Sequence, residues 1–112
     1  MKRIDAVVRH EKLGAVRIGL DEIGCGKVTV FEARGHGAEE GAKEIWRGQI
    51  YRADLLPKAA IMLVVDDSAV DKVVKSIMEN AKTDNIGDGK IFVSNVEAAY
   101  KIRTGEKGDT SL

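Results

Sequence analysis

The chain has 112 residues, the size of one small domain, and 44% of them are hydrophobic, which suffices for a single core. Its 18 basic and 18 acidic residues cancel, so no overall field attracts nucleic acid or anionic lipid, and the few aromatic residues argue against an RNA-stacking platform. One cysteine excludes an internal disulfide, and no segment is typical of a signal peptide or a membrane span, so we expect a cytoplasmic protein.

The first half of the chain predicts a strand, a helix and a second strand. Residues 4–8 and 27–31 are rich in β-forming side chains. Residues 11–23 carry apolar side chains at helical spacing, and two glycines follow that would end this helix. These apolar residues are Leu13, Val16, Leu20 and Ile23, and the glycines are Gly24 and Gly26.

The second half repeats that order. Residues 60–65 are apolar enough for a central strand, and residues 91–93 predict another. Between them, Asp66, Asp67 and Ser68 offer helix N-caps, with Asp71 three residues after Ser68. One helix face is apolar: Val70, Val73, Val74, Ile77 and Ala81. Two β-α-β halves predict an α+β, ferredoxin-like domain, with a four-stranded antiparallel sheet and two helices on one face.

Residues 35–57 form an unusually long connection between the halves. Connections in compact domains are commonly about 4–6 residues, and longer ones tend to be functional. Trp46, Arg47 and Tyr51 lie in this segment and are residue types that dominate interface energetics. One interpretation is a β-hairpin extension with a small apolar contact; the favoured one is a mobile loop that binds a partner.

Residues 83–92, "TDNIGDGKIF", place two glycines around an aspartate, just before a lysine and a strand. Gly87 and Gly89 permit positive φ and can expose consecutive N–H groups to an anion, with Lys90 beside them. The spacing is not that of a Walker A loop. From these residues alone, a plain glycine turn and a phosphate site remain equally open.

The ensemble of motifs resembles the PII signal-transduction family, the nitrogen regulatory proteins. The segments that carry the resemblance are "MKRIDA" (1–6), Gly35-x-Gly37, "WRGQIYRADLLPK" (46–58), "IGDGKIFV" (86–93) and "IRTGEKGD" (102–109). The resemblance covers the chain end to end and implies a single PII-like domain, residues 1–112, that forms a homotrimer. It also implies a T-loop at about 36–56, a B-loop at about 82–90 and a C-terminal loop at about 102–112.

By this resemblance, ATP or ADP binds in clefts between subunits. The nucleotide-binding residues it implies are Thr29 at the adenine, Val64, Gly35 and Gly37 through their backbones, Gly87, Asp88, Gly89 and Lys90 at the phosphates, and Lys101 and Arg103 from the next subunit. The chain departs from the family pattern at Lys101, commonly arginine, at Asp84, commonly glycine, and at Met62, commonly glutamate.

The resemblance also implies a second ligand, 2-oxoglutarate bound with Mg²⁺ and ATP at the base of the T-loop. The matching residues are Gly37, Gly41 and Lys58, with Glu39 in place of the family's metal-binding glutamine and Glu40 in place of a common lysine. Glutamate can still ligate a hard cation, but it brings negative charge toward a dianion.

The implied output is regulation, with no catalytic residue. Arg47, Trp46 and Tyr51 would contact an ammonium transporter or a nitrogen-metabolism enzyme, Tyr51 is a candidate for nucleotidylation, and Gln49 replaces a serine phosphorylated in some relatives. His10, His36 and Cys25 have no recognisable metal or catalytic spacing, so we interpret them as structural. The alternatives are a slow ATP-hydrolysing enzyme and a trimeric metal-tolerance protein of similar fold.

Overall fold

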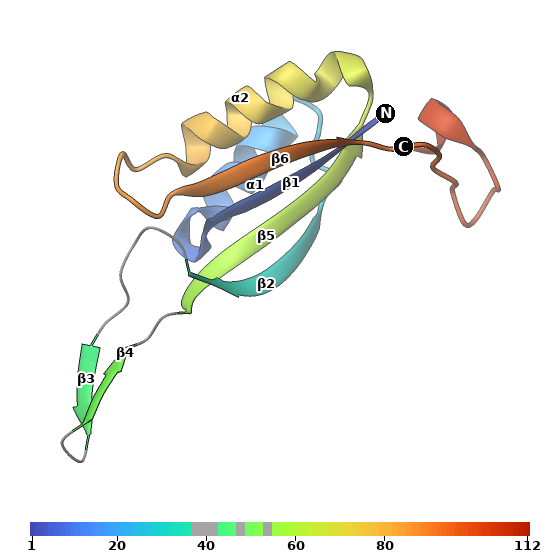
Figure 1. Ribbon diagram of the computed structural model, residues 1–112. Helices are drawn as coiled ribbons and strands as arrows, with labels where there is room; N and C mark the ends of the chain where they lie inside the picture. The colour runs from blue at the N-terminus through green and yellow to red at the C-terminus, as the bar shows by residue number, and fades with distance from the viewer. Residues whose placement is uncertain (37–42, 47–48, 53–54) are drawn as a thin grey trace.

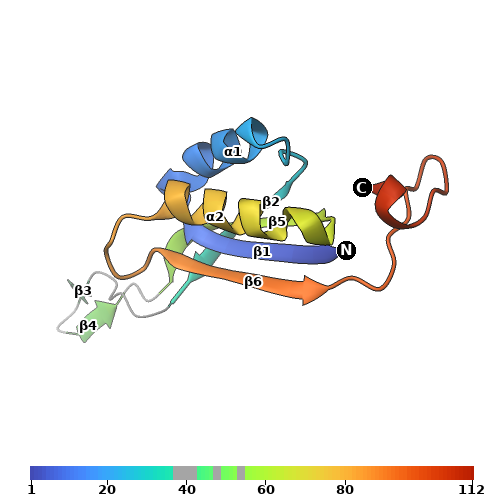
Figure 2. The same cartoon turned by 90° about the horizontal axis from the view of Figure 1, so that it is seen from above.

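The structure is a computed structural model that describes residues 1–36, 43–46, 49–52 and 55–112. Its main sheet has four strands in the order β2-β5-β1-β6, and every neighbouring pair is antiparallel. The strands are β1 (Lys2–Arg9), β2 (Thr29–Gly35), β5 (Leu56–Val65) and β6 (Gly89–Asn95). Helices α1 (Leu13–Glu22) and α2 (Val70–Ala81) both lie on one face of this sheet (Figures 1 and 2). The predicted ferredoxin-like α+β fold is confirmed.

The core lies between the helices and one face of the two central strands. Alternate residues of β1 and β5 point to this face, as the pleat requires, and one side of each helix covers them. The buried residues are Ile4, Ala6 and Val8 of β1, Ala59, Ile61 and Leu63 of β5, Val16 and Leu20 of α1, and Val73, Ile77 and Ala81 of α2. The apolar faces read from the helical spacing therefore supply the helix side of the core.

Helix α1 ends as the sequence predicts. Gly24 has φ +75°, a left-handed conformation that a glycine adopts without strain. Its N–H donates to Asp21 O at 3.0 Å, and the N–H of Cys25 donates to Leu20 O at 2.9 Å, which is the Schellman pattern. Cys25 packs partly buried against the core, consistent with a structural thiol.

The start of the second helix differs from the predicted cap. A 3-10 turn, Asp67–Ala69, precedes α2, and Asp66 caps that turn by accepting from the N–H of Ser68 at 3.3 Å. Ala69 stands before α2 itself and makes no side-chain cap. The acidic run thus caps an extra turn, because three adjacent polar residues allowed several registers for the helix start. The first helix is likewise shorter than expected, since residues 10–12 form a 3-10 turn.

Each of the four strands of the main sheet is longer than the segment predicted for it. The central strand β5 begins at Leu56, four residues before the predicted start, and pairs there with the end of β2. Strand β2 extends to Gly35 through charged residues that are exposed, because β2 is an edge strand. Sheet pairing therefore extends these strands beyond the apolar runs that revealed them.

The long connection contains a second, two-stranded sheet. Strands β3 (Lys43–Trp46) and β4 (Gln49–Arg52) pair antiparallel, with Trp46 opposite Gln49 and Glu44 opposite Tyr51. Figure 1 shows this hairpin beyond the end of the main sheet where β2 ends and β5 begins. The hairpin interpretation holds for the backbone of these strands. The predicted contact residues Trp46 and Tyr51 lie on them, and Arg47 lies outside the described residues.

The other face of the main sheet carries no helix. One row across it runs through Thr29, Met62, Asp5 and Phe92, which are cross-strand neighbours. Phe92 is 56% exposed and Phe31 of the same face is 52% exposed. In the described part of the chain, neither helix has the length and apolar character needed to cross a membrane.

Candidate functional site: a glycine loop at one end of the sheet

The loop of residues 82–88 joins α2 to β6 and sits at one end of the sheet. At this end β1 finishes at Arg9, β2 finishes at Gly35, and β5 brings in Lys58. Arg9 and Lys58 are direct cross-strand partners, so their side chains leave the same face. The topology thus brings together three segments that are far apart in sequence.

The backbone of this loop is held in conformations that suit glycine. Gly87 has φ +101° and Gly89 has φ +107°. A Cβ on Gly89 would lie 1.7 Å from Val7 O, so this position accepts glycine alone. Asp84 also has positive φ, +66°, at a position where the PII pattern commonly has glycine. Asp84 therefore adopts the same left-handed conformation that a glycine would adopt here, but with some backbone strain.

Asp88 organises the loop through its carboxylate. It accepts hydrogen bonds from the Thr83 N–H at 2.8 Å, from the Thr83 hydroxyl, and from the Asp84 N–H at 3.1 Å. Arg9 Nε donates to the same carboxylate at 3.0 Å. The hydrogen bonds from Thr83 above all, and then the one from Arg9, hold the pKa of Asp88 well below its usual range. Its predicted place is at the phosphates, yet here its carboxylate serves the loop itself.

Two cations also hold the loop by its carbonyl groups. Arg9 donates from its Nη2 to Ile86 O at 2.7 Å, and Lys58 donates from Nζ to Gly87 O at 2.8 Å. Lys58 is buried, with 8% of its surface exposed. The family resemblance implies Lys58 at a second ligand, and no sequence pattern pointed to Arg9. An arginine that ends a strand could have been noticed only if the pairing of that strand with residues 89–95 were known.

A cavity of about 560 Å³ adjoins this loop. It is lined mainly by the loop and by the ends of β1, β2 and β5: Val7, Gly35, His36, Lys58, Asn85, Ile86, Gly87, Asp88, Gly89, Lys90 and Phe92. Backbone N–H groups beside positive-φ glycines, with Lys90 next to them, form a donor set that suits a phosphate oxygen. The phosphate-site reading of this glycine turn therefore fits the geometry.

The structure separates the remaining predicted nucleotide residues from this cavity. Thr29 and Gly35 are the two ends of β2, and six residues of extended chain span about 20 Å. Val64 stands equally far along β5 from Lys58, again about 20 Å. Thr29 and Val64 lie on the face without helices, toward the opposite end of the sheet.

Lys101 and Arg103 are also at the opposite end. Strand β6 spans about 20 Å and carries the chain away from the loop before these residues are reached. Figures 1 and 2 both show the C-terminal segment beyond the far end of the sheet. Within one chain the predicted nucleotide residues thus fall into two groups: Gly35 and residues 87–90 at one end, and Thr29, Val64, Lys101 and Arg103 toward the other.

The predicted residues of the second ligand are only partly visible. Lys58 lies at the cavity, as its hydrogen bond to Gly87 O shows. Gly37, Glu39, Glu40 and Gly41 lie outside the described residues. The predicted Mg²⁺ ligand, Glu39, is one of them.

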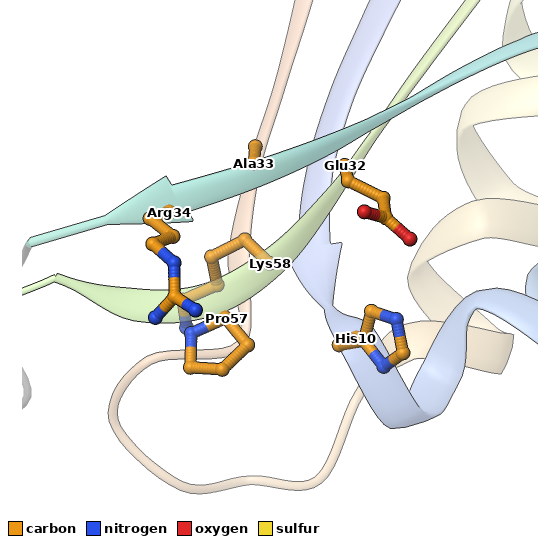
Figure 3. Close-up of a pocket in the computed structure, with 6 residues that line it drawn as sticks. All are labelled: His10, Glu32, Ala33, Arg34, Pro57 and Lys58. Carbon is orange, nitrogen blue, oxygen red and sulfur yellow. The ribbon is translucent and has the colours of Figure 1, made fainter.

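A second cavity, of about 620 Å³, lies beside the 3-10 turn that follows β1. It is lined by His10, Glu32, Ala33, Arg34, Pro57 and Lys58. Figure 3 shows His10 and Glu32 on one side of it, and Arg34 with Pro57 on the other. Its charges are mixed: His10, Glu32 and Arg34 are exposed, and the buried Lys58 is the predicted site residue among its described lining.

Fold and loop together define a class: ferredoxin-like α+β domains with a glycine-rich loop between the second helix and the last strand of the main sheet. The family model "Nitrogen regulatory protein P-II" matches residues 1–106. The chain belongs to this P-II family of signalling regulators of nitrogen metabolism.

Individual relatives agree over the full length. "Nitrogen regulatory protein P-II 2" of Methanothermobacter thermautotrophicus is 51% identical over 112 residues, which is 100% of this chain and 97% of that protein. "Nitrogen regulatory protein P-II 1" of Escherichia coli is 46% identical, and "Nitrogen regulatory protein P-II" of Rhodospirillum rubrum is 45% identical, each over 100% of both chains.

Proposed function

We propose that this protein is a non-enzymatic regulator that binds ATP or ADP in clefts between the subunits of a homotrimer. The observation that carries the proposal is the separation of the site into two groups. The cradle of Gly87, Gly89 and Lys90 lies at the start of strand β6, and Arg103 follows the other end of this strand, which spans about 20 Å. One chain cannot close both around a nucleotide, but the cradle of one subunit and the far end of a second can.

The uncovered face of the sheet supports assembly. Phe31 and Phe92 are each more than half exposed on this face. Exposed apolar side chains gathered on one face are a feature of interaction surfaces. A trimer in which these faces meet would bury them and bring Thr29 and Val64 of one subunit toward the cradle of another.

Mixed trimers test this arrangement directly. Lys90→Gln weakens the cradle, and Arg103→Gln weakens the far end, so each variant alone should lose ADP affinity in calorimetric titrations. In trimers re-formed from both variants, some subunit interfaces pair the intact cradle of an Arg103→Gln subunit with the intact Arg103 of a Lys90→Gln subunit. We expect a high-affinity fraction to return in the mixture, and Lys75→Gln, on the exposed face of α2, is the charge-matched control. A mixture that binds no better than its components, or a protein that is monomeric by light scattering, contradicts the proposal.

The proposal includes 2-oxoglutarate as a second effector, held with Mg²⁺ at the base of the T-loop. Lys58 Nζ lies beside the nucleotide cradle, where it could also meet a carboxylate. Glu39 would bind the metal through oxygen, and the metal would offset the charge that this glutamate adds. A titration with 2-oxoglutarate in the presence of Mg²⁺ and ATP should release heat, and an absence of heat would remove this ligand.

The output of the proposed regulator is the segment of residues 36–56. Occupancy of the cradle and of Lys58 would bias the arrangement of this segment, whose two ends, Gly35 and Leu56, pair at the rim of the site. Trp46, Arg47 and Tyr51 would then contact an ammonium transporter or a nitrogen-metabolism enzyme. Arg47→Ala should abolish partner capture and leave ADP affinity unchanged. ATP turnover at an ordinary enzyme rate, above roughly 1 s⁻¹, would favour the enzymatic alternative.

A further inference from the structure

Arg9 and Lys58 reach consecutive carbonyl groups of the glycine loop from adjacent strands. We propose that these two side chains are positioning residues, which aim the N–H groups of Gly87 and Asp88 into the cavity where a phosphate would bind. The inference rests on the proposed function, since it concerns the same site. It assigns a task to Arg9, and it gives Lys58 a role that precedes any second ligand.

The geometric step follows from the peptide bond. In a trans peptide the C=O and the N–H point in opposite directions, and the described chain has no cis peptide. Arg9 fixes Ile86 O at 2.7 Å, which turns the N–H of Gly87 away from Arg9. Lys58 fixes Gly87 O at 2.8 Å, which turns the N–H of Asp88 away from Lys58. Two successive donors are thereby oriented without a ligand.

These two N–H groups have no acceptor within the described ranges. Among the residues that the structure describes, no hydrogen bond joins the N–H of Gly87 or of Asp88 to another residue. Both residues line the cavity of about 560 Å³. A pair of adjacent unpaired N–H groups facing a cavity is the arrangement that binds a phosphate oxygen.

Arg9 restrains both sides of Gly87. One guanidinium holds Ile86 O before this glycine and the carboxylate of Asp88 after it. Glycine is the residue with the greatest backbone freedom, so without these restraints the loop would sample many orientations of its peptides. The Arg9 side chain is 18% exposed and the Asp88 side chain 25%, so both bonds are partly shielded from water.

If Arg9 acted only by attracting the phosphate through its positive charge, a lysine at this position would replace it fully. A lysine at position 9 would keep the positive charge but lose the fork that holds two acceptors at once. Arg9→Lys therefore separates orientation from attraction. Arg9→Met removes both, and Lys58→Met tests the second carbonyl. Arg17→Met, on the exposed surface of α1, is the control for loss of one positive charge.

The experiment compares phosphate-bearing and phosphate-free probes on the full-length protein, without Mg²⁺ or 2-oxoglutarate. ADP, adenosine and pyrophosphate are titrated, and the amide NMR signals of Gly87 and Asp88 are followed. Arg9→Met and Lys58→Met should each weaken ADP and pyrophosphate about tenfold, the loss of one hydrogen bond to an ionised group. Adenosine affinity should stay unchanged, Arg17→Met should bind like the unaltered protein, and Arg9→Lys should recover only a part of the loss. ADP should shift both amide signals downfield in the unaltered protein, and less in Arg9→Met.

Three results would overturn the inference. They are ADP binding by Arg9→Met equal to that of the unaltered protein, full recovery by Arg9→Lys, and an equal loss of ADP and adenosine, which would indicate a folding defect. If the unaltered protein binds pyrophosphate but not ADP, the proposed function is wrong, but the inference that Arg9 and Lys58 orient the two N–H groups is still supported. Failure to bind either probe would remove both.

Discussion

The glycine loop of residues 82–88 and the C-terminal turn of residues 100–108 look alike in sequence and differ in how they are held. Each contains positive-φ glycine, Gly87 in the first and Gly105 and Gly108 in the second, together with basic side chains. The first is held by side chains from the sheet, through Arg9, Lys58 and its own Asp88. The second is closed by its own backbone, with Lys101 N–H donating to Glu106 O and Gly105 N–H donating to Lys101 O, each at 2.8 Å.

The two regions also differ in how far their side chains are exposed to solvent. Ile102, at the tip of the C-terminal turn, has no contact that shields it and is fully exposed, whereas Lys58 behind the glycine loop is buried. The C-terminal turn keeps its shape through its own hydrogen bonds, but it does not pack against the described sheet or helices of its own chain. The glycine loop is thus held by side chains of the sheet, whereas the C-terminal turn is held by bonds within itself.

The largest expected contrast is between Gly89, which directly follows the glycine loop and begins β6, and Gly105 of the C-terminal turn. Gly89→Ala would place a methyl group 1.7 Å from Val7 O and force β6 away from β1. We expect a loss of roughly 3 kcal/mol or more in the free energy of unfolding. Gly105→Ala also has positive φ, +75°, but nothing lies within 4 Å, so its cost should be about 1 kcal/mol.

Urea denaturation of both variants at one protein concentration measures this contrast, because assembly would otherwise shift the midpoints. Similar losses for the two substitutions would mean that the glycine loop is no more constrained than the turn.

The second prediction concerns acid. The folded protein holds the pKa of Asp88 below its ordinary value, which is about 3.9 in an unfolded chain. The carboxylate therefore contributes stability that is present above about pH 4 and is lost as pH falls below it. Asp88→Asn should be less stable at pH 7 but lose less on acidification.

Thr83→Val is the companion variant, since Thr83 contributes the largest part of the shift. Its removal should raise the pKa of Asp88 toward the ordinary value, which carbon-detected NMR titration measures. Identical acid profiles for all three proteins would exclude Asp88 as the group that organises the loop.

The third prediction concerns the other region. Arg103 is exposed, so Arg103→Gln should change the free energy of unfolding by less than about 0.5 kcal/mol. The same substitution should weaken ADP binding by about tenfold if Arg103 meets a phosphate of a neighbouring site. Unfolding and calorimetry on the same sample separate the two quantities, and unchanged ADP affinity would place this turn outside the nucleotide site.

The smallest effect is expected at Asp84. This residue has φ +66°, and its exposed carboxylate lies 3.1 Å from Lys82 Nζ. Asp84→Gly and Asp84→Asn both remove a negative charge near the cradle, and both residues tolerate positive φ. Each should tighten ATP binding by about twofold to threefold, a charge effect at roughly 10 Å in a watery environment. Tightening by glycine alone would assign the effect to backbone strain. Unchanged or weaker binding by both variants would show that the carboxylate does not oppose ATP binding.

The sequence by itself determined the architecture of this protein. Helical and strand periods in two similar halves led to the four-stranded sheet with helices on one face, and Gly24 ended α1 as expected. These features depend on local periodicity and on the conformational freedom of glycine, which are legible without tertiary contacts. The motifs also led to the family that the family model then confirmed. The cap of α2 and the ends of β2 and β5 were misplaced, because pairing partners decide them.

Only the tertiary structure decided how the candidate site is built. Arg9 and Lys58 become neighbours because β1 and β5 pair in one register, and both then reach a loop that is 77 and 29 residues away in sequence. The same register sends Thr29 and Val64 toward the opposite end. No local sequence pattern predicts these neighbours, because the order and register of the strands decide which side chains lie next to one another. The sheet order therefore divides the predicted nucleotide residues into two groups, which the proposed function joins across a boundary between subunits.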